Sequence, residues 1–449
     1  MRGWALWAVL LVALALPARA EQPPTSAATV PGVRAARATP VGRAVLNNGM
    51  VVLVTESPGE DIVAVEVLIR VGLAEENAPL SGVTGLIQDV LQNRIARDAS
   101  GQDELEMTGS LLTCTAEPDY ARISLVTTSR DFPHLLDKIA TALKKRDFSE
   151  AEVKDSRDKI LNALRGDRGA FTQLYEIFKQ NFYRYHPYKN NEDGTEASVS
   201  RLDAATVRKF YQEYYVPNRM VVCVSGRVSR TEVLTQARKD FSSMKSLDRH
   251  QLEIPWEPKA SEKEIFLSAN SSIAWVFLGY PAPSVGSRDY VAMKLIWALM
   301  GDGLSSRLFT EIREKRGLAY ELGAVYPVLS GPSHMLTYTI TKPEQVGRAR
   351  HQIFVEIDRL KEHGVGEAEL SASRRKLIGN YYLDRETNTG RAFNLALAEV
   401  VGVGYEFDVN FVREVQSVTP AEIQQVARRY LDNYTLVVAR PGGRFYFDF

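Results

Sequence analysis

The chain has 449 residues, of which 45% are apolar and 24% are charged. This length exceeds what one ordinary hydrophobic core serves and suits two domains of about 200 residues each. The 55 Lys and Arg residues balance the 55 Asp and Glu residues, so the formal net charge is zero. A nucleic-acid-binding surface needs an excess or a stripe of positive charge, so this balance argues against a nucleic-acid partner.

The first 20 residues have the pattern of a secretory signal peptide. Arg2 precedes an apolar run at 4–16, and residues 18–20 read Ala-Arg-Ala, with small residues where a signal peptidase cleaves. The run is shorter than the ~20 residues that a spanning helix needs, and no other segment comes close. We expect export to the periplasm or the medium after cleavage near Ala20, with no transmembrane segment in the mature chain.

Residues 21–42 are rich in Pro, Ala and Thr and predict a flexible arm. A hairpin is expected directly afterwards, because Asn48-Gly49 lies between two apolar alternations and favours a tight turn.

An internal duplication organises the rest of the chain. Residues 148–168 align with 365–385 at an offset of 217, with eight identities in 21 positions. Residues 202–226 align with 418–442 at an offset of 216, and both segments predict an amphipathic helix followed by a strand that ends at Gly. Two matches at nearly one offset indicate two copies of one unit.

Each copy predicts strands, a helix, a strand pair, long helices, and a final helix and strand. Because the helices cluster instead of alternating strictly with strands, we expect them to cover one face of a mainly antiparallel sheet. The prediction is an α+β fold of two homologous tandem halves, at 43–244 and 263–449, joined by a polar linker at 245–262. Helices are expected near 131–145, 149–168 and 203–214 in the first copy, and near 343–363, 366–384 and 419–430 in the second.

The common catalytic motifs are absent from the sequence. There is no P-loop and no G-x-S-x-G elbow, and residues 301–306 (GDGLSS) lack the third Gly of a dinucleotide fingerprint. No two of the six His lie three or four residues apart, the spacing that places two metal ligands on one helix face. His186 is expected in a surface loop. Cys114 and Cys223 are expected to be small buried hydrophobic residues, although a disulfide between them stays open.

The segment 301–320 concentrates charge and ends in a glycine. Asp302 or Ser305 is expected to cap a short helix, and Gly317 is expected to end it in the left-handed conformation. Its last-turn cations suit the helix dipole. None of this requires Arg313 or Tyr320, which on composition alone are an exposed helix charge and a strand residue.

Residues 303–320, GLSSRLFTEIREKRGLAY, nonetheless resemble the C-terminal signature of the pitrilysin/insulinase family of zinc peptidases, which includes mitochondrial processing peptidase. Residues 46–53 resemble the opening hairpin of that family, and 184–226 resemble the segment that closes its first half. The resemblance covers nearly the whole mature chain and implies the duplicated α+β architecture.

The resemblance also implies a zinc motif, H-x-x-E-H, on a helix of the first half, in which two His bind the metal and the Glu activates water. Aligned on Gly82, the corresponding residues are Gly85, Gln88 and Asp89, and the further Glu ligand falls near Asn162 or Ala163. Gly has no ligand atom, Gln is no base, and one carboxylate does not hold zinc. This chain is therefore expected to bind no catalytic zinc and no other cofactor.

In the family, an Arg and a Tyr matching Arg313 and Tyr320 bind the substrate peptide near the scissile bond. In two-subunit members one chain supplies the zinc and the other this pair. The resemblance implies a non-catalytic subunit that presents Arg313 and Tyr320 to a peptide or unfolded polypeptide, with zinc on a paralogous partner. Two alternatives stay open: a structural or peptide-binding homologue without a role in proteolysis, and a self-sufficient peptidase with an unusual metal site.

Overall fold

The computed structural model describes residues 40–97, 101–247, 257 and 261–442. The predicted signal peptide, nearly all of the predicted arm and most of the predicted linker lie outside the described residues. The arm prediction was too long at its end, because the first strand begins at Val41 and not after residue 42.

The N-terminal half is built on a six-stranded mixed sheet with the order β1-β2-β6-β3-β5-β4. Only the pairing of β2 with β6 is parallel. The turn between β1 and β2 contains Gly49 at φ 82°, as the Asn-Gly signal predicted. The strands are β1 (Val41–Val45), β2 (Val51–Glu56), β3 (Val63–Ile69), β4 (Leu111–Ala116), β5 (Ala121–Thr127) and β6 (Met220–Gly226).

The C-terminal half repeats this topology. Its sheet has the order β7-β11-β8-β10-β9, which is the order of the first sheet without β1, and only β7 and β11 are parallel. The predicted α+β fold of two homologous halves is thereby confirmed. The strands are β7 (Lys263–Ala269), β8 (Ala274–Ala282), β9 (Glu321–Val325), β10 (Ser333–Thr341) and β11 (Thr435–Pro441).

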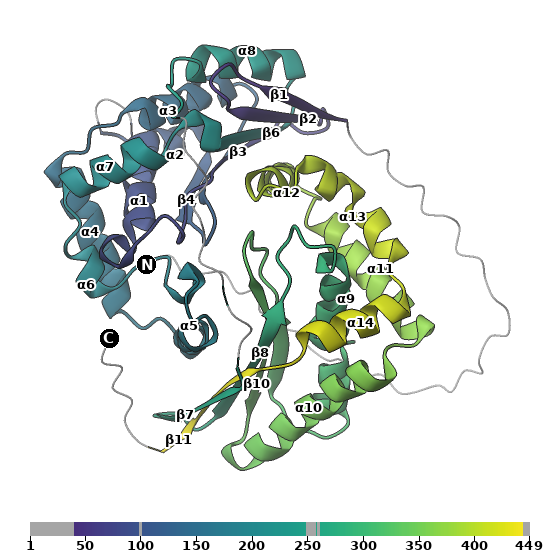
Figure 1. The fold of residues 1–449 in the computed structure, drawn as a ribbon. Coiled ribbons are helices and arrows are strands. Elements are labelled where there is room, and N and C mark those ends of the chain that lie inside the picture. The colour runs from purple at the N-terminus through teal and green to yellow at the C-terminus, as the bar shows by residue number, and fades with distance from the viewer. Residues whose placement is uncertain (1–39, 98–100, 248–256, 258–260, 443–449) are drawn as a thin grey trace, which may run out of the picture. The chain divides into compact units, whose positions relative to one another are not determined.

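The helices cluster as the duplication predicted (Figure 1). Several begin at capping boxes that their sequences encode, such as Ser149 with Glu152 in the first half and Thr419 with Glu422 in the second. The helices of the N-terminal half are α1 (Val83–Ala96), α2 (Glu104–Thr108), α3 (Phe132–Lys144), α4 (Glu150–Arg165), α5 (Ala170–Phe182), α6 (Glu196–Val199), α7 (Ala204–Tyr214) and α8 (Arg230–Phe241). Those of the C-terminal half are α9 (Tyr290–Gly301), α10 (Val346–His363), α11 (Glu367–Leu383), α12 (Asn388–Val400), α13 (Tyr405–Ser417) and α14 (Pro420–Tyr430).

The two halves exchange one helix each. Helix α5 packs on β8 and β11 of the C-terminal sheet, and its duplicate α12 packs on β3 and β6 of the N-terminal sheet (Figure 1). Phe178 of α5 is fully buried, and a Cβ added at Gly279 of β8 would lie 2.2 Å from its ring. Ala392 and Ala396 of α12 are buried in a cluster with Cys223. Each sheet thus has one face covered by the other half of the chain.

The expectation for His186 is wrong, and the question left open about a disulfide is answered. His186 was predicted in a surface loop, but it is fully buried against the Tyr188 ring, and burial lowers its pKa to about 4. Cys114 and Cys223 are free. They lie on β4 and β6, which are separated by β5 and β3, and a distance of roughly three strand spacings, about 14 Å, is too long for a disulfide.

Within the described ranges, no helix combines the length and the apolar character that crossing a membrane requires.

Candidate functional site

Helix α1 carries the three positions that correspond to the zinc motif. It begins after Gly82, whose φ of 90° favours glycine. The buried carboxyl of Glu76 accepts the amide hydrogens of Gly82 (2.8 Å) and Thr84 (2.9 Å), which satisfies two donors at the helix start. Burial raises the pKa of Glu76 to about 7. The start of this helix is therefore fixed by a buried acid.

Gln88 faces the hydrophobic core. Its side chain is 1% exposed, and its Nε2 donates to the Tyr215 hydroxyl at 3.0 Å. Gly85, one turn earlier, has no side chain, although a Cβ there would meet only the Glu192 carbonyl oxygen, at 3.5 Å. The positions of a first metal ligand and of a general base are thus occupied by a glycine and by a core amide.

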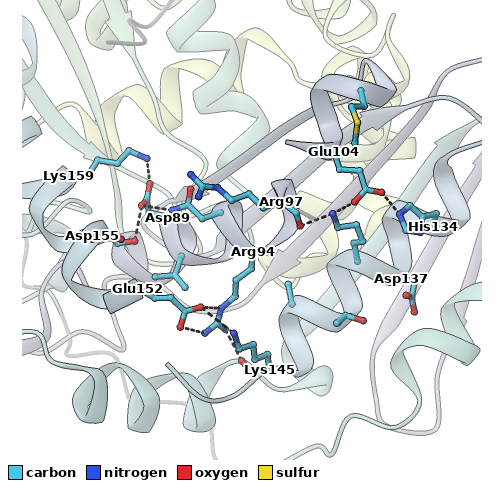
Figure 2. Close-up of a pocket in the computed structure, with 17 residues that line it drawn as sticks. Asp89, Arg94, Arg97, Glu104, His134, Asp137, Lys145, Glu152, Asp155 and Lys159 are labelled. Atoms are coloured by element: carbon cyan, nitrogen blue, oxygen red, sulfur yellow. Dashed lines mark hydrogen bonds and ion pairs between the residues drawn. The ribbon is translucent and has the colours of Figure 1, made fainter. Parts of the chain in front are cut away.

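Asp89 is already neutralised by α4. Its carboxylate accepts from the Ser156 hydroxyl at 2.8 Å and forms an ion pair with Lys159. Figure 2 shows Lys159 reaching toward Asp89 from the neighbouring helix. The only acid that the motif retains therefore has a cation supplied by the chain itself.

These residues do not fit a catalytic zinc ion. A catalytic zinc site needs three protein ligands of the His, Cys, Asp or Glu type. Among the described residues, no three such side chains are placed so that they could hold a metal ion together. Asn162 and Ala163, where the downstream ligand was expected, are exposed. Ser156 and Lys159 were missed by the sequence reasoning. Their signal was a spacing of three residues on a predicted helix, which places both on one face.

A cavity of about 1000 Å³ opens beside Asp89, bounded by α1, α2, α3 and α4. Its walls are charged, but most of the charges are paired with each other (Figure 2). Arg94 bonds both carboxylate oxygens of Glu152, and Glu104 pairs with His134 and Lys138. The pairing accounts for these side chains structurally, without a ligand.

The N-terminal end of the helix in the segment 301–320 differs from the prediction. Asp302 does not cap the helix, since its carboxylate accepts from Asn380 (3.0 Å) and pairs with Lys376 (3.3 Å). Ser305 is exposed, and the Ser306 hydroxyl is the group that accepts the Phe309 amide, at 3.4 Å. The helix also takes a π-helical turn at Phe309–Glu314. Such turns are rare in proteins, and those that occur are often found at functional sites.

The end of the segment is as predicted. Gly317 has a φ of 60° and donates its amide to the Arg313 carbonyl at 3.0 Å. Lys315 and Arg316 both pair with Glu311 at 2.7 Å. Hydrogen bonds from these two side chains, that of Lys315 first, hold the pKa of Glu311 below its ordinary value. The charges at the helix end are therefore structural.

Arg313 and Tyr320 differ from their neighbours. Both are exposed, and Tyr320 has 51% of its surface accessible. The Arg313 guanidinium lies over the Phe309 ring, 5.0 Å from its centroid. Within the part of the chain that the structure describes, neither side chain makes a hydrogen bond or ion pair. Their polar groups are free to bind a ligand.

Comparison with known families identifies the chain. The model described as insulinase (peptidase family M16) matches residues 51–190, and the model described as peptidase M16 inactive domain matches residues 201–377. The chain belongs to the M16 peptidase family. The predicted resemblance to pitrilysin and insulinase is thus confirmed, and within that family this chain lacks the zinc motif.

Several curated relatives of this M16 chain are named zinc proteases. An uncharacterized zinc protease of Streptomyces coelicolor is 26% identical over 87% of this chain and 87% of its own length. An uncharacterized zinc protease of Mycobacterium tuberculosis is 25% identical over 89% of this chain and 93% of its own. The zinc protease PqqE of Helicobacter pylori is 25% identical over 72% and 76%.

Solved structures share the fold of this M16 chain. A protease from Helicobacter pylori superposes with a TM-score of 0.82 at 22% identity, covering 90% of this chain and 100% of that one. A protein described as a peptidase M16 inactive domain, from Pseudomonas fluorescens, superposes with a TM-score of 0.78 at 20% identity, covering 90% and 99%.

Proposed function

We propose that this chain is an exported, non-catalytic subunit of a heteromeric M16 zinc peptidase. Its partner is a paralogous chain that carries the zinc, and its substrate is a peptide or an unfolded polypeptide. Arg313 and Tyr320 of this chain bind that substrate in trans, while the partner cleaves it. Export rests on the signal-peptide pattern of the first 20 residues.

One contrast carries the proposal. The zinc-motif positions are filled by residues with structural partners, Tyr215 for Gln88 and Lys159 for Asp89. Arg313 and Tyr320, in contrast, leave their polar groups exposed beside a π-helical turn. A chain that keeps the substrate pair but not the metal set is suited to complete another chain's active site.

The chemistry of the pair fits peptide binding. The Arg313 guanidinium offers several N–H donors in a planar fork, which can hold peptide carbonyl oxygens in one orientation. The Tyr320 hydroxyl can donate a hydrogen bond to the oxyanion that develops at a carbonyl under attack, and a loss of one such donor costs about 10²–10³ in rate.

The test is cleavage by the reconstituted complex. The two chains are co-expressed, purified together and assayed on an unstructured peptide. Neither Arg313→Ala nor Tyr320→Phe should weaken assembly, and each should lower kcat/KM at least tenfold. Arg316→Ala is the matched control, because Arg316 is an exposed cation that already pairs with Glu311. Unchanged cleavage by the first two variants would show that the in-trans role is wrong.

A second candidate is a peptide-binding or scaffolding protein without a role in proteolysis. Strand β4 favours it, because β4 ends its sheet and an edge strand offers backbone groups to an extended peptide. Gln92 occupies one of these groups, accepting the Cys114 amide at 3.2 Å. Peptide binding by this chain with no zinc-bearing partner recovered in pull-downs would support the second candidate and contradict the first.

A further inference from the structure

A second cavity lies in the C-terminal half, among α9, α11, α12 and α13. Its volume of about 320 Å³ is at the lower end of the range for small-molecule sites. None of the zinc-motif positions and neither Arg313 nor Tyr320 lines it. It is therefore a separate feature of the fold.

Helix α9 brings a lysine to this cavity. The Lys294 ammonium lies 4.9, 5.2 and 5.7 Å from the ring centroids of Tyr326, Trp297 and Tyr290. It donates one hydrogen bond, to the Tyr326 carbonyl oxygen at 3.1 Å. Since an ammonium has three N–H donors, two of them have no partner in the described part of the chain.

The acidic residues near Lys294 either bind other side chains or are exposed to solvent. Asp302 is bound by Asn380 and Lys376, and Asp408 forms an ion pair with Arg385. Asp384, on the cavity lining, is exposed. Within the described ranges, no carboxylate makes a hydrogen bond or ion pair with Lys294.

The electrostatics of Lys294 agree with this geometry. Desolvation lowers its pKa to about 8, against the attraction of Asp384 and Asp302. At pH 7 the side chain is therefore still mostly a cation, held among aromatic rings. A half-buried, partly desolvated cation without a close counter-ion is costly, and an anionic ligand would reduce that cost.

Tyr290 lies one helical turn before Lys294 and on the same face. It is 3% exposed, and its hydroxyl makes no hydrogen bond within the described residues. Tyr290 also lines the cavity, so its hydroxyl is available to a ligand there. Two neighbouring donors on one face of α9 thus lack acceptors, and apolar side chains line the rest of the cavity, including Leu397, Phe407 and Phe411.

We propose that this cavity binds a small carboxylate with an apolar body. Its oxygens accept hydrogen bonds from the Lys294 ammonium and the Tyr290 hydroxyl, and its body packs on Leu397, Phe407 and Phe411. The site goes beyond the proposed function and does not depend on it, because it needs no partner chain and no substrate-binding pair.

The test is calorimetric titration of the purified chain with 3-phenylpropionate and with its neutral isostere, 3-phenylpropionamide. The acid should bind with a stoichiometry of one, and the amide at least tenfold more weakly. Lys294→Met should weaken binding of the acid at least tenfold, and Tyr290→Phe about three- to tenfold. Lys154→Met, which removes an exposed lysine of α4, is the control and should leave binding unchanged.

Binding should also respond to pH in one direction. The acid remains ionised above pH 6, so its affinity should be constant up to about pH 7.5 and fall as Lys294 loses its proton around pH 8. Tyr290 does not titrate there, because burial raises the pKa of its hydroxyl.

Three results would overturn the proposal: no binding of the acid at 10 mM, equal binding of acid and amide, or unchanged binding by Lys294→Met. If Lys294→Met did not fold, the comparison of acid with amide on the wild-type chain and the Tyr290→Phe variant would still decide the matter.

Discussion

The helix pair α1 and α4 of the N-terminal half and its duplicate, α9 and α11, are joined by related ion pairs. Lys159 of α4 binds Asp89 of α1. Lys376 occupies the same place in the duplicate (376 − 159 = 217) and pairs with Asp302 at the end of α9, at 3.3 Å. In both halves a lysine on the long helix supplies the positive charge between the helices. The N-terminal half therefore needs no metal to neutralise this contact.

Other cations of the C-terminal half show the opposite condition. Lys294 lies among aromatic rings without a close acid, and Arg313 is exposed without one. Lys159 and Lys376 are engaged by acids of the chain itself, whereas Lys294 and Arg313 are available to ligands. The following variants test that distinction, and the helix exchange on which both halves depend.

The largest effect is expected at the exchanged helix α5. Phe178→Ala should lower the free energy of unfolding by about 3–5 kcal/mol, because a fully buried ring is lost against Gly279. Leu395→Ala in the duplicate α12 should cost about 2–4 kcal/mol. Chemical denaturation followed by circular dichroism measures both. Phe266→Ala, at a 56% exposed position, is the control, and a Phe178→Ala loss no larger than the control's would refute the role of the exchange.

A smaller effect of opposite sign is expected at Lys294. Its pKa is about 8 in the folded chain and 10.5 as an ordinary lysine, so folding disfavours its charged form. The penalty is fully present below pH 8 and disappears as the pH rises to 10.5. Lys294→Met should therefore stabilise the chain by about 1–3 kcal/mol at pH 7 and by much less at pH 10.5. Urea unfolding at the two pH values measures this, and a destabilised variant at pH 7 would contradict it.

The two duplicated ion pairs should be worth less. Lys159 is 65% exposed, and Lys376 is 24% exposed. Lys159→Met should cost no more than about 0.5 kcal/mol and Lys376→Met about 1 kcal/mol, because exposed pairs are screened by water. Urea unfolding of the two variants measures both losses. A larger loss for Lys159→Met than for Lys376→Met would contradict the expected order.

The smallest effect on stability is expected at Arg313 and Tyr320. Since both side chains are exposed and make no hydrogen bond within the described residues, Arg313→Ala and Tyr320→Phe should change the unfolding free energy by less than about 0.5 kcal/mol. Thermal melting measures this. A large loss would assign them a structural role and weaken the proposed role in substrate binding.

Helix positions and the glycine at a helix end could be predicted, because they depend on residues close together in the sequence. The helices expected at 149–168 and 366–384 are α4 and α11, and Gly317 takes the left-handed conformation that its place after a charged turn indicated. The helix cap was missed, because Asp302, Ser305 and Ser306 are all good caps in sequence. In the structure Ser306 caps the helix, whereas the Asp302 carboxylate binds Lys376 and Asn380.

The sequence by itself determined the duplication and the α+β class, because these depend on periodicity and spacing along the chain. The loss of the zinc ligands followed from the family resemblance, which showed which residues stand at the motif positions. The tertiary structure alone decided that α5 and α12 cross to the opposite sheets, that His186 is buried, and that Lys159 neutralises Asp89. Each of these depends on which surfaces meet. Which residues far apart in sequence meet depends on the shape and charge of surfaces that exist only in the folded chain.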